Sequence, residues 1–416
     1  MVRVATIDEL DLPDLIRPGD RVIFSQGTAE PRSLTQRLVA QHNELPEIEV
    51  FLGAQFSETF SAGDCPRMSF VSYGALGRTA ALAHKGRLSV IPSHYGWLSQ
   101  TYTSGERRAD VALLQLAPPQ AGRGYSLSLA NDIAAQAARH ARLVIAEVNA
   151  DAPWTFGAEL PPEITPHILV EAKHKPIELP PPSTGPTEEA IARFVAELIP
   201  DGATLQLGVG MIPEAILAQL AHHRDLGIHS GQIGDGVVKL IESGVITNSK
   251  RRLNQGCTVS GSLFGTRRLY DFAHLNPVIR VRPPSETHSF NVIADIDRFI
   301  AINSAIEIDL TGQVNAEVAN DIYVGGLGGQ LDFIRGANAS AGGRAIIALP
   351  ATARNGTVSR IVPSLTTVTC PRGDVDAIVT EFGIAELRGQ SLDERRRRII
   401  AIAAPQFRDQ LAATQH

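Results

Sequence analysis

Three loops hold the residue types best suited to bind a ligand or an oxyanion. The first runs from Gly208 to Ile212, between a short apolar segment and a helical pattern. Glycines let the backbone turn tightly, and the N–H groups at a helix start lack intrahelical partners, so a phosphate, carboxylate or oxyanion would suit this loop. It is not a dinucleotide fingerprint, because Pro213 stands at the third glycine position. A plain tight turn is the alternative.

The second loop has four glycines among the five residues 325–329. Such a run loses much backbone entropy on folding, which suggests that backbone N–H groups approach a ligand closely and stabilise an oxyanion. A structural β-turn is the alternative.

The third loop, residues 355–360, places small polar residues beside Arg354 and Arg360, which could hold a phosphate or carboxylate. A solvated loop explains it equally well.

Short apolar strands alternate with amphipathic helices along the chain and would position these loops. Residues 111–116 and 345–349 are continuous apolar runs of the length that buried parallel strands have. Residues 188–198 show the apolar stripe of an amphipathic helix. The sequence therefore predicts the α/β class, with helices on both faces of a mostly parallel sheet.

A proline-rich stretch divides the chain into two lobes. Residues 173–189 contain five prolines and no helical or strand period, which indicates an extended connector. We expect an N-terminal lobe at 1–180 and a C-terminal lobe at 181–416. Residues 18–27 and 200–210 share a turn, a strand and a glycine turn, which suggests an internal duplication, although chance is the alternative because this arrangement is common.

Composition excludes several classes of protein. The chain has 416 residues, of which 44% are hydrophobic and 20% charged, as in ordinary globular proteins. The net charge of −6 offers no basic field for nucleic acid. Apolar runs are too short to span a bilayer and no signal peptide pattern is present, so we expect a soluble, cytoplasmic protein. The cysteine and histidine spacings predict no disulfide framework and no metal site.

These loops and several other blocks of the sequence, taken together and in this order along the chain, resemble the acetyl-CoA hydrolase/transferase family. These are the single-chain family I CoA-transferases of the 4-hydroxybutyrate CoA-transferase type. The most specific block is 326–337, and 205–210, 302–307 and 380–389 also match. The resemblance implies two similar open α/β lobes, coenzyme A as part of an acyl-CoA substrate, no metal, and a homodimer. It also implies CoA-binding or oxyanion roles for Gly208, Val209, Gly210, Met211, Ile212, Ile306, Gly326, Gly328 and Gly329.

The resemblance breaks at the catalytic position of the family. There a glutamate attacks the thioester and becomes a glutamyl-CoA thioester, in a pattern H-T-E-x-x-S-D-G. This chain has H-S-G-Q-I-G-D-G over 229–236, so Gly231 stands where the glutamate is expected. A nearby family asparagine is replaced by His288. The resemblance therefore implies that Gly231, Gln232 and His288 lie in the catalytic site.

Three functions are open at this point. The first expectation is hydrolysis of a CoA thioester or of a carbon–carbon bond beside it, or cyclisation of the acyl chain. His288 would act as general base, since imidazole titrates near neutral pH, and Gln232 would orient a water or an amide. An acyl-CoA:carboxylate CoA-transferase using another carboxylate, such as Asp235 or Glu286, is an alternative. A non-catalytic acyl-CoA-binding protein is another, with His288 as an ordinary surface residue.

Overall fold

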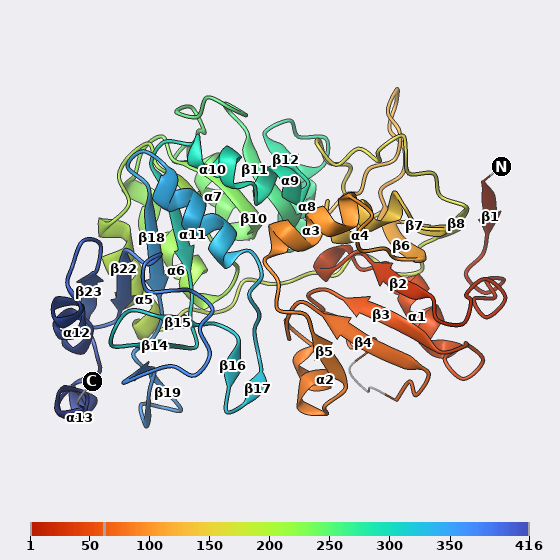
Figure 1. Cartoon of the computed structure of the whole chain (residues 1–416). Helices are drawn as coiled ribbons and strands as arrows, with labels where there is room; N and C mark the ends of the chain where they lie inside the picture. Colours follow the sequence, from red (N-terminus) through yellow and green to blue (C-terminus); the bar gives the residue numbers. More distant parts are fainter. Residues whose placement is uncertain (1, 61–63, 415–416) are drawn as a thin grey trace. The chain divides into compact units, whose positions relative to one another are not determined.

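Two parallel β-sheets with helices packed against them form the framework of the computed structural model (Figure 1). The structure describes residues 2–60 and 64–414. They group into two compact units. The first comprises the described residues up to Pro180 together with 259–287 and 322–328, and the second comprises 181–258, 288–321 and the described residues from Gly329 onward. The predicted α/β class with two parallel-sheet lobes is confirmed, while the boundary at residue 180 stays a prediction about domains.

The first unit contains an eight-stranded parallel sheet in the order β1-β8-β7-β6-β2-β3-β4-β5. Its strands are β1 (Arg3–Ala5), β2 (Arg21–Phe24), β3 (Ile48–Leu52), β4 (Met68–Ser72), β5 (Leu88–Val90), β6 (Val111–Leu116), β7 (Leu143–Val148) and β8 (Ile168–Glu171). Its helices are η1 (Gly27–Ala29), α1 (Arg32–Ala40), α2 (Ala80–His84), α3 (Tyr95–Thr103) and α4 (Ile133–Ala138). Segments 259–287 and 322–328 of this unit contain most of β11 (Thr258–Leu263), together with α8 (Arg267–Ala273), β12 (Ile279–Val281), α9 (Pro284–Thr287) and β17 (Ile322–Tyr323).

In the second unit the strand order is β10-β9-β13-β18-β22-β23, with only β23 antiparallel to its neighbour among these described pairs. The strands are β9 (Thr204–Gln206), β10 (Gly227–Ile233), β13 (Phe299–Asn303), β18 (Arg344–Ala348), β22 (Ala377–Thr380) and β23 (Gly383–Glu386). The helices are α5 (Pro186–Glu197), α6 (Met211–Gln219), η2 (Leu220–His222), α7 (Asp235–Glu242), α10 (Phe290–Ala294), α11 (Gln330–Ala339), α12 (Leu392–Ala401) and α13 (Pro405–Ala413). Short strands are β14 (Glu307–Asp309), β15 (Val314–Asn315), β16 (Val318–Ala319), β19 (Thr352–Ala353), β20 (Val358–Ser359) and β21 (Ile361–Val362).

The elements follow local patterns in the sequence. β6 is buried at every residue, as its continuous apolar run predicts. The helix expected over 188–198 begins slightly earlier, at Pro186, because proline suits the first helical position. The backbone N–H of Gly185 donates to Glu188 Oε2 at 3.0 Å and helps to satisfy the start of that helix.

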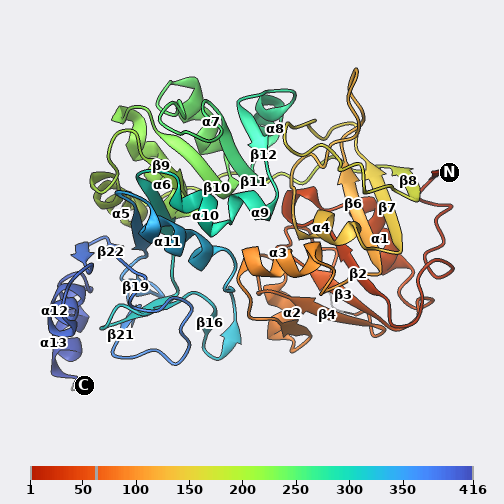
Figure 2. The same cartoon turned by 45° about the horizontal axis from the view of Figure 1, so that its top comes forward.

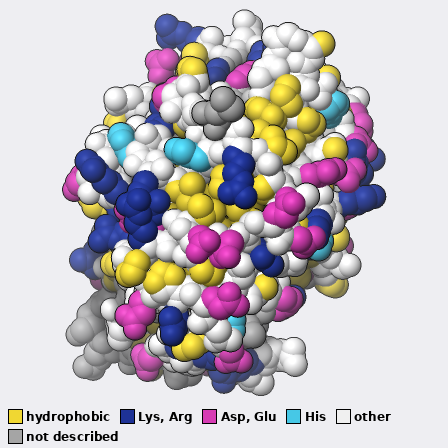
Figure 3. Space-filling view, turned by 90° about the vertical axis from the view of Figure 1, so that its right-hand side faces the viewer, with side chains coloured by type: hydrophobic (Ala, Val, Ile, Leu, Met, Phe, Trp, Pro, Cys, Tyr) yellow, Lys and Arg dark blue, Asp and Glu magenta, His cyan; other side chains and the backbone are white. Residues whose placement is uncertain are grey.

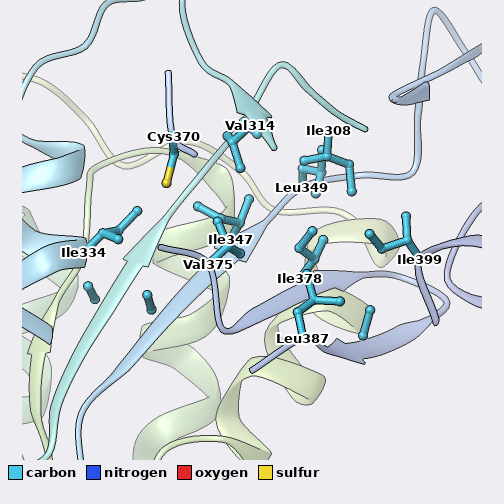
Figure 4. Packing of buried hydrophobic residues seen from close by; sticks show 14 of the residues in the cluster. Ile308, Val314, Ile334, Ile347, Leu349, Cys370, Val375, Ile378, Leu387 and Ile399 are labelled. Atoms are coloured by element: carbon cyan, nitrogen blue, oxygen red, sulfur yellow. The ribbon is translucent and has the colours of Figure 1, made fainter. Parts of the chain in front are cut away.

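Aliphatic side chains from β13, β14, β18, β22 and α11 form the core of the second unit (Figure 4). Ile334 of α11 lies at one end of this cluster and Ile399 of α12 at the other, with Ile347 and Ile378 between them (Figure 4). All four side chains are fully buried. This packing holds the sheet and α11 in a fixed arrangement, on which the loops at the sheet edge depend.

The surface carries charges of both signs. On the face shown in Figure 3, Lys or Arg and Asp or Glu side chains alternate with small apolar areas. No helix within residues 2–60 and 64–414 has the length and apolarity that crossing a bilayer requires.

A glycine in α11 allows α10 to pack closely against it. A Cβ at Gly336 would lie 2.5 Å from Ile293 Cγ2 and 2.6 Å from Ile293 Cβ. Because a rotamer change does not move Ile293 Cβ, we expect Gly336→Ala to lower the free energy of unfolding by about 2 kcal/mol, despite the better helix propensity of alanine. Urea denaturation of this variant and of Gly373→Ala, an exposed glycine with open space around it, tests this. Equal stability of the two variants would contradict it.

Candidate active site

A cavity of about 280 Å³ lies at the carboxyl ends of β9 and β13. Strands β9, β10, β13 and β18 are parallel, so the loops that follow them meet at one edge of the sheet. Figure 2 shows β9 and β10 side by side. The cavity is lined by Glu188, Gly208, Val209, Gly210, Met211, Ile212, Pro213, Ile302, Asn303, Ser304, Pro350 and Arg360. The first predicted loop, residues 208–212, therefore forms one wall of a ligand-sized space.

Gly210 makes the turn from this loop into α6. Its φ of +136° and ψ of −177° are open to glycine but strained for other residues. α6 begins at the next residue, Met211, so the N–H groups of Met211 and Ile212 lie in the first turn and lack intrahelical partners. The wall thus offers the donors and positive partial charge that favour an anionic or carbonyl ligand.

The cavity lining also contains polar side chains, among them Asn303, Ser304 and Arg360. The amides of Asn303 and Gln206 bond to each other, with Asn303 Nδ2 donating to Gln206 Oε1 at 3.0 Å. Arg360 Nη1 donates to the Ala305 carbonyl at 3.4 Å, while its buried Nε makes no hydrogen bond within the described residues. Arg360 lines the cavity and has more N–H donors than the bond to Ala305 uses, so other donors of the guanidinium remain for a ligand.

Several of these lining residues were missed as site residues from the sequence. Arg360 was identified in the third loop as a possible partner of a phosphate or carboxylate, whereas Asn303 and Ser304 lie in the matched block 302–307, which gave their side chains no role. Nothing in the sequence marked Pro350 or Glu188 as a site residue. Pro350 follows a strand, and Glu188 lies at the start of a helix.

His288 and Gly231 lie against each other at the end of β10. A Cβ built on Gly231 would lie 3.0 Å from both Nε2 and Cε1 of His288. A Cβ built on Gly329 would lie 2.5 Å from Nε2 and Cδ2 of the same ring. The ring centroid is 4.6 Å from that of Phe333 in α11. The imidazole therefore occupies the space beside Gly231 that a side chain at this position would enter.

Burial sets the charge of His288. Its side chain is only 9% exposed, so it is not an ordinary surface histidine. Desolvation lowers its pKa to about 3, and the ring is therefore neutral at physiological pH. A group with so low a pKa attracts a proton weakly, since general bases work best with a pKa near the operating pH. The general-base role of His288 stays a prediction that its surroundings disfavour.

Gln232 and Ser230 face away from His288, because side chains alternate along a strand. They line a space of about 10 Å³ together with Gly208 and Glu214. Burial raises the pKa of the Glu214 carboxyl, and the nearby charge of Asp235 raises it further. Glu214 was not singled out from the sequence, although it follows the first loop directly. The space holds a single water at most and no acyl group.

The remaining predicted residues lie apart from the cavity lining. Ile306 donates its N–H to the Asn315 carbonyl at 2.8 Å and belongs to the backbone around β14 and β15. Gly326 and Gly328 lie in the first unit. Gly326 packs on Gly74, where a Cβ at position 326 would be 2.8 Å from Gly74 Cα, so close approach of two backbones explains this glycine. Their ligand roles stay predictions.

Asp235 and Glu286 are the two carboxylates that the sequence offered as alternative nucleophiles. Asp235 is buried at the first position of α7. Glu286 lies in the first unit, with its Oε2 3.4 Å from Arg282 Nε. Among the residues that the structure describes, no three His, Cys, Asp or Glu side chains come together as metal ligands would.

Known proteins are similar to this chain over nearly its whole length. Residues 3–168 match the acetyl-CoA hydrolase/transferase N-terminal domain, and residues 265–415 match the C-terminal domain of that name. The 4-hydroxybutyrate coenzyme A transferase of Clostridium kluyveri is 40% identical over 95% of this chain and 94% of its own length. The succinyl-CoA:cyclohexane-1-carboxylate CoA transferase of Geobacter metallireducens is 34% identical over 95% of this chain and 92% of its own. The crystal structure of RipA from Yersinia pestis superposes with a TM-score of 0.91 at 34% identity, covering 99% of this chain and 96% of RipA.

The lowered pKa of His288 predicts an acid-sensitive fold. Between the usual histidine pKa of about 6.5 and about 3, the unfolded chain binds a proton here that the folded chain does not, so stability falls as the pH falls through this window. From pH 7.5 to pH 5 we expect this group to cost the folded state about 2 kcal/mol. Urea denaturation at both pH values should show a smaller loss in His288→Gln than in the wild type. His84→Gln, at an exposed histidine, is the control, and identical losses in all three proteins would contradict the prediction.

Proposed function

The chain belongs to the acetyl-CoA hydrolase/transferase family, and we propose that it transfers coenzyme A from an acyl-CoA thioester to a free carboxylate. The observation that carries the proposal is the cavity formed by residues 208–213 and Arg360. Similarity over the whole chain to relatives named as CoA transferases favours this reaction over the hydrolysis expected first from the sequence.

The cavity supports binding of an acyl-CoA. Its volume of about 280 Å³ suits part of an extended ligand. The start of α6 and the guanidinium of Arg360 favour anionic or carbonyl oxygens, and Val209, Met211 and Ile302 supply apolar walls. A pantetheine arm or a phosphate group of coenzyme A fits this combination. The homodimer implied by the resemblance stays a prediction.

The residues around Gly231 offer no evident enzyme nucleophile. Gly231 has no side chain, the lowered pKa of the buried His288 imidazole makes that ring a weak base and a weak nucleophile, and Glu214 faces a space too small for an acyl group. We therefore assign the attack to the acceptor acid. Its carboxylate oxygen bonds to the thioester carbon, the C–S bond breaks, and coenzyme A leaves as the thiolate from a mixed anhydride. The thiolate then attacks the acceptor's carbonyl carbon and expels the donor acid as a carboxylate.

Hydrolysis is the second candidate, because a site without an enzyme carboxylate also lets water act as the acceptor. The chemistry then differs in one respect: a water oxygen, not a carboxylate oxygen, bonds to the thioester carbon. One proton goes to the thiolate and the products are free coenzyme A and the donor acid.

Product analysis separates the two reactions. A panel of acyl-CoA thioesters is incubated with the enzyme and carbon-labelled acetate in heavy-oxygen water. Transfer predicts labelled acetyl-CoA that forms only with acetate present, and no covalent protein adduct in the intact mass. Free coenzyme A with heavy oxygen in the released acid supports hydrolysis. An enzyme-bound thioester in the intact mass contradicts direct attack, and an absence of all products contradicts both reactions.

Arg360 provides a separate test of the binding site. Removing a charged hydrogen-bond donor typically costs about 1.5–3 kcal/mol, so Arg360→Met should raise the acyl-CoA KM about tenfold or more. The matched control is Arg354→Met, since Arg354 is exposed and lies outside the cavity lining. Steady-state kinetics measure both variants. Similar KM values for the two would show that the cavity is not the acyl-CoA site.

A further inference from the structure

Glu30 and Glu147 are two carboxyl groups of the first unit that neither the candidate site nor the proposed reaction uses. Each residue is only 1% exposed. We propose that the two carboxyls share one proton at and below neutral pH, and that the loss of this proton to solvent at higher pH loosens α1 from the sheet of the first unit. The inference goes beyond the proposed function and does not rest on it, because the residues that line the cavity belong to the second unit.

The first turn of α1 binds both carboxyls. Glu147 extends from β7, and its Oε2 accepts hydrogen bonds from the backbone N–H of Ser33 at 2.7 Å and of Leu34 at 3.3 Å. Glu30 precedes the helix, and its Oε1 accepts a hydrogen bond from the hydroxyl of Thr35 at 2.7 Å. Because three consecutive residues of one turn bind them, the two carboxyls lie close together where α1 meets β7.

Gln115 of β6 is the third polar side chain at this place. It is the residue paired with Glu147 across the two parallel strands, so both side chains lie on the same face of the sheet. Gln115 Oε1 accepts a hydrogen bond from Asn149 Nδ2 at 3.0 Å, while its buried Nε2 makes no hydrogen bond within the described residues. The amide thus presents an N–H group beside Glu147, and this neutral donor brings no charge to balance a carboxylate.

Within residues 2–60 and 64–414, no ion pair balances the two carboxyls. The charge of Arg32 acts on Glu30, but more weakly than burial does, and Arg32 Nη2 lies 3.4 Å from the Lys175 carbonyl. Taking a carboxylate out of water without a counter-charge is costly, and two like charges side by side also repel each other. A retained proton reduces both costs, so the pair keeps one.

The pKa values of the two carboxyls agree with a retained proton. Burial raises the pKa of Glu30, and nearby hydroxyls such as that of Ser57 offset this shift only in part. Burial also raises the pKa of Glu147 to about 7, where the N–H groups of α1 oppose the shift and the charge of Glu30 adds to it. Two interacting carboxyls titrate as a unit, so the proton belongs to the pair and to neither residue alone.

Opening of α1 changes how tightly this proton is bound. In an opened state Glu147 returns to water, where the pKa of glutamate is about 4.3. Between that value and about 7 the closed state therefore binds more protons than the opened state, and its stability falls as the pH rises through this window. His174, whose Nε2 lies 2.8 Å from Gln36 Oε1 of α1, does not cause this fall, because burial lowers its pKa and its ring is neutral at pH 7 and above.

Hydrogen exchange of α1 tests the proposal in the full-length protein without an activity assay. After correction for the intrinsic pH dependence of exchange, protection of the peptide 32–40 should fall about tenfold between pH 6 and pH 8.5, because a proton bound with a pKa near 7 is lost there. In Glu147→Gln, where a neutral amide replaces the carboxyl, the fall should be about twofold or less.

The matched control is Glu171→Gln, at an exposed carboxyl of β8, which should behave as the wild type does. Protection that does not change with pH in the wild type overturns the proposal, and so does an equal fall in the wild type and in Glu147→Gln.

A double variant tests whether the proton is shared. If one proton serves both carboxyls, either Glu30→Gln or Glu147→Gln removes the fall in protection, because the remaining carboxyl no longer faces a second charge. The double variant then removes little more. Glu30→Gln gives the same reading if Glu147→Gln does not fold. Two partial effects that add up in the double variant show two independent carboxyls and overturn the sharing.

Discussion

The parallel pairing of β10, β9 and β13 is the constraint on which the candidate site depends. Gly227 of β10 and Phe299 of β13 both pair with Thr204 of β9, so the three strands run in register toward the same edge. Each strand then delivers a different group there: the glycine loop after β9, Gly231 near the end of β10, and Asn303 at the end of β13. A parallel sheet needs long returning connections, and these place α6, α7 and α11 against the strands.

The cavity and the surroundings of His288 are two different electrostatic environments at this edge of the sheet. At the cavity, unsatisfied N–H groups and a guanidinium donor favour negative charge on a ligand. Around His288, packing against glycines and Phe333 removes water and keeps the imidazole neutral. The two places therefore differ in what they offer: the cavity has hydrogen-bond donors for a ligand, and the buried ring has a pKa too low for an effective general base.

Membership of the acetyl-CoA hydrolase/transferase family establishes the fold and the class of enzyme. It does not by itself choose the acceptor, because carboxylate and water attack the same thioester carbon. The pairing of a glycine at 231 with a histidine at 288 is a local feature of this chain that bears on that choice. Position 231 carries no side chain and the His288 ring lies against it, so these two residues offer no carboxylate there.

Local patterns in the sequence were enough to predict the α/β class, strands such as β6 and β18, and the glycine turn within residues 208–212. Apolar runs, helix-start prolines and glycine turns act on their immediate neighbours, so one sequence suffices to identify them. The tertiary structure decided the rest. The pKa of His288 is lowered because residues distant in the chain, among them Gly231, Gly329 and Phe333, pack around the ring and remove it from water. Arg360 and Asn303 join one cavity only because β13 and the later loop return to the same sheet edge. Burial, and therefore pKa and pocket shape, is a property of segments brought together, and no local pattern specifies it.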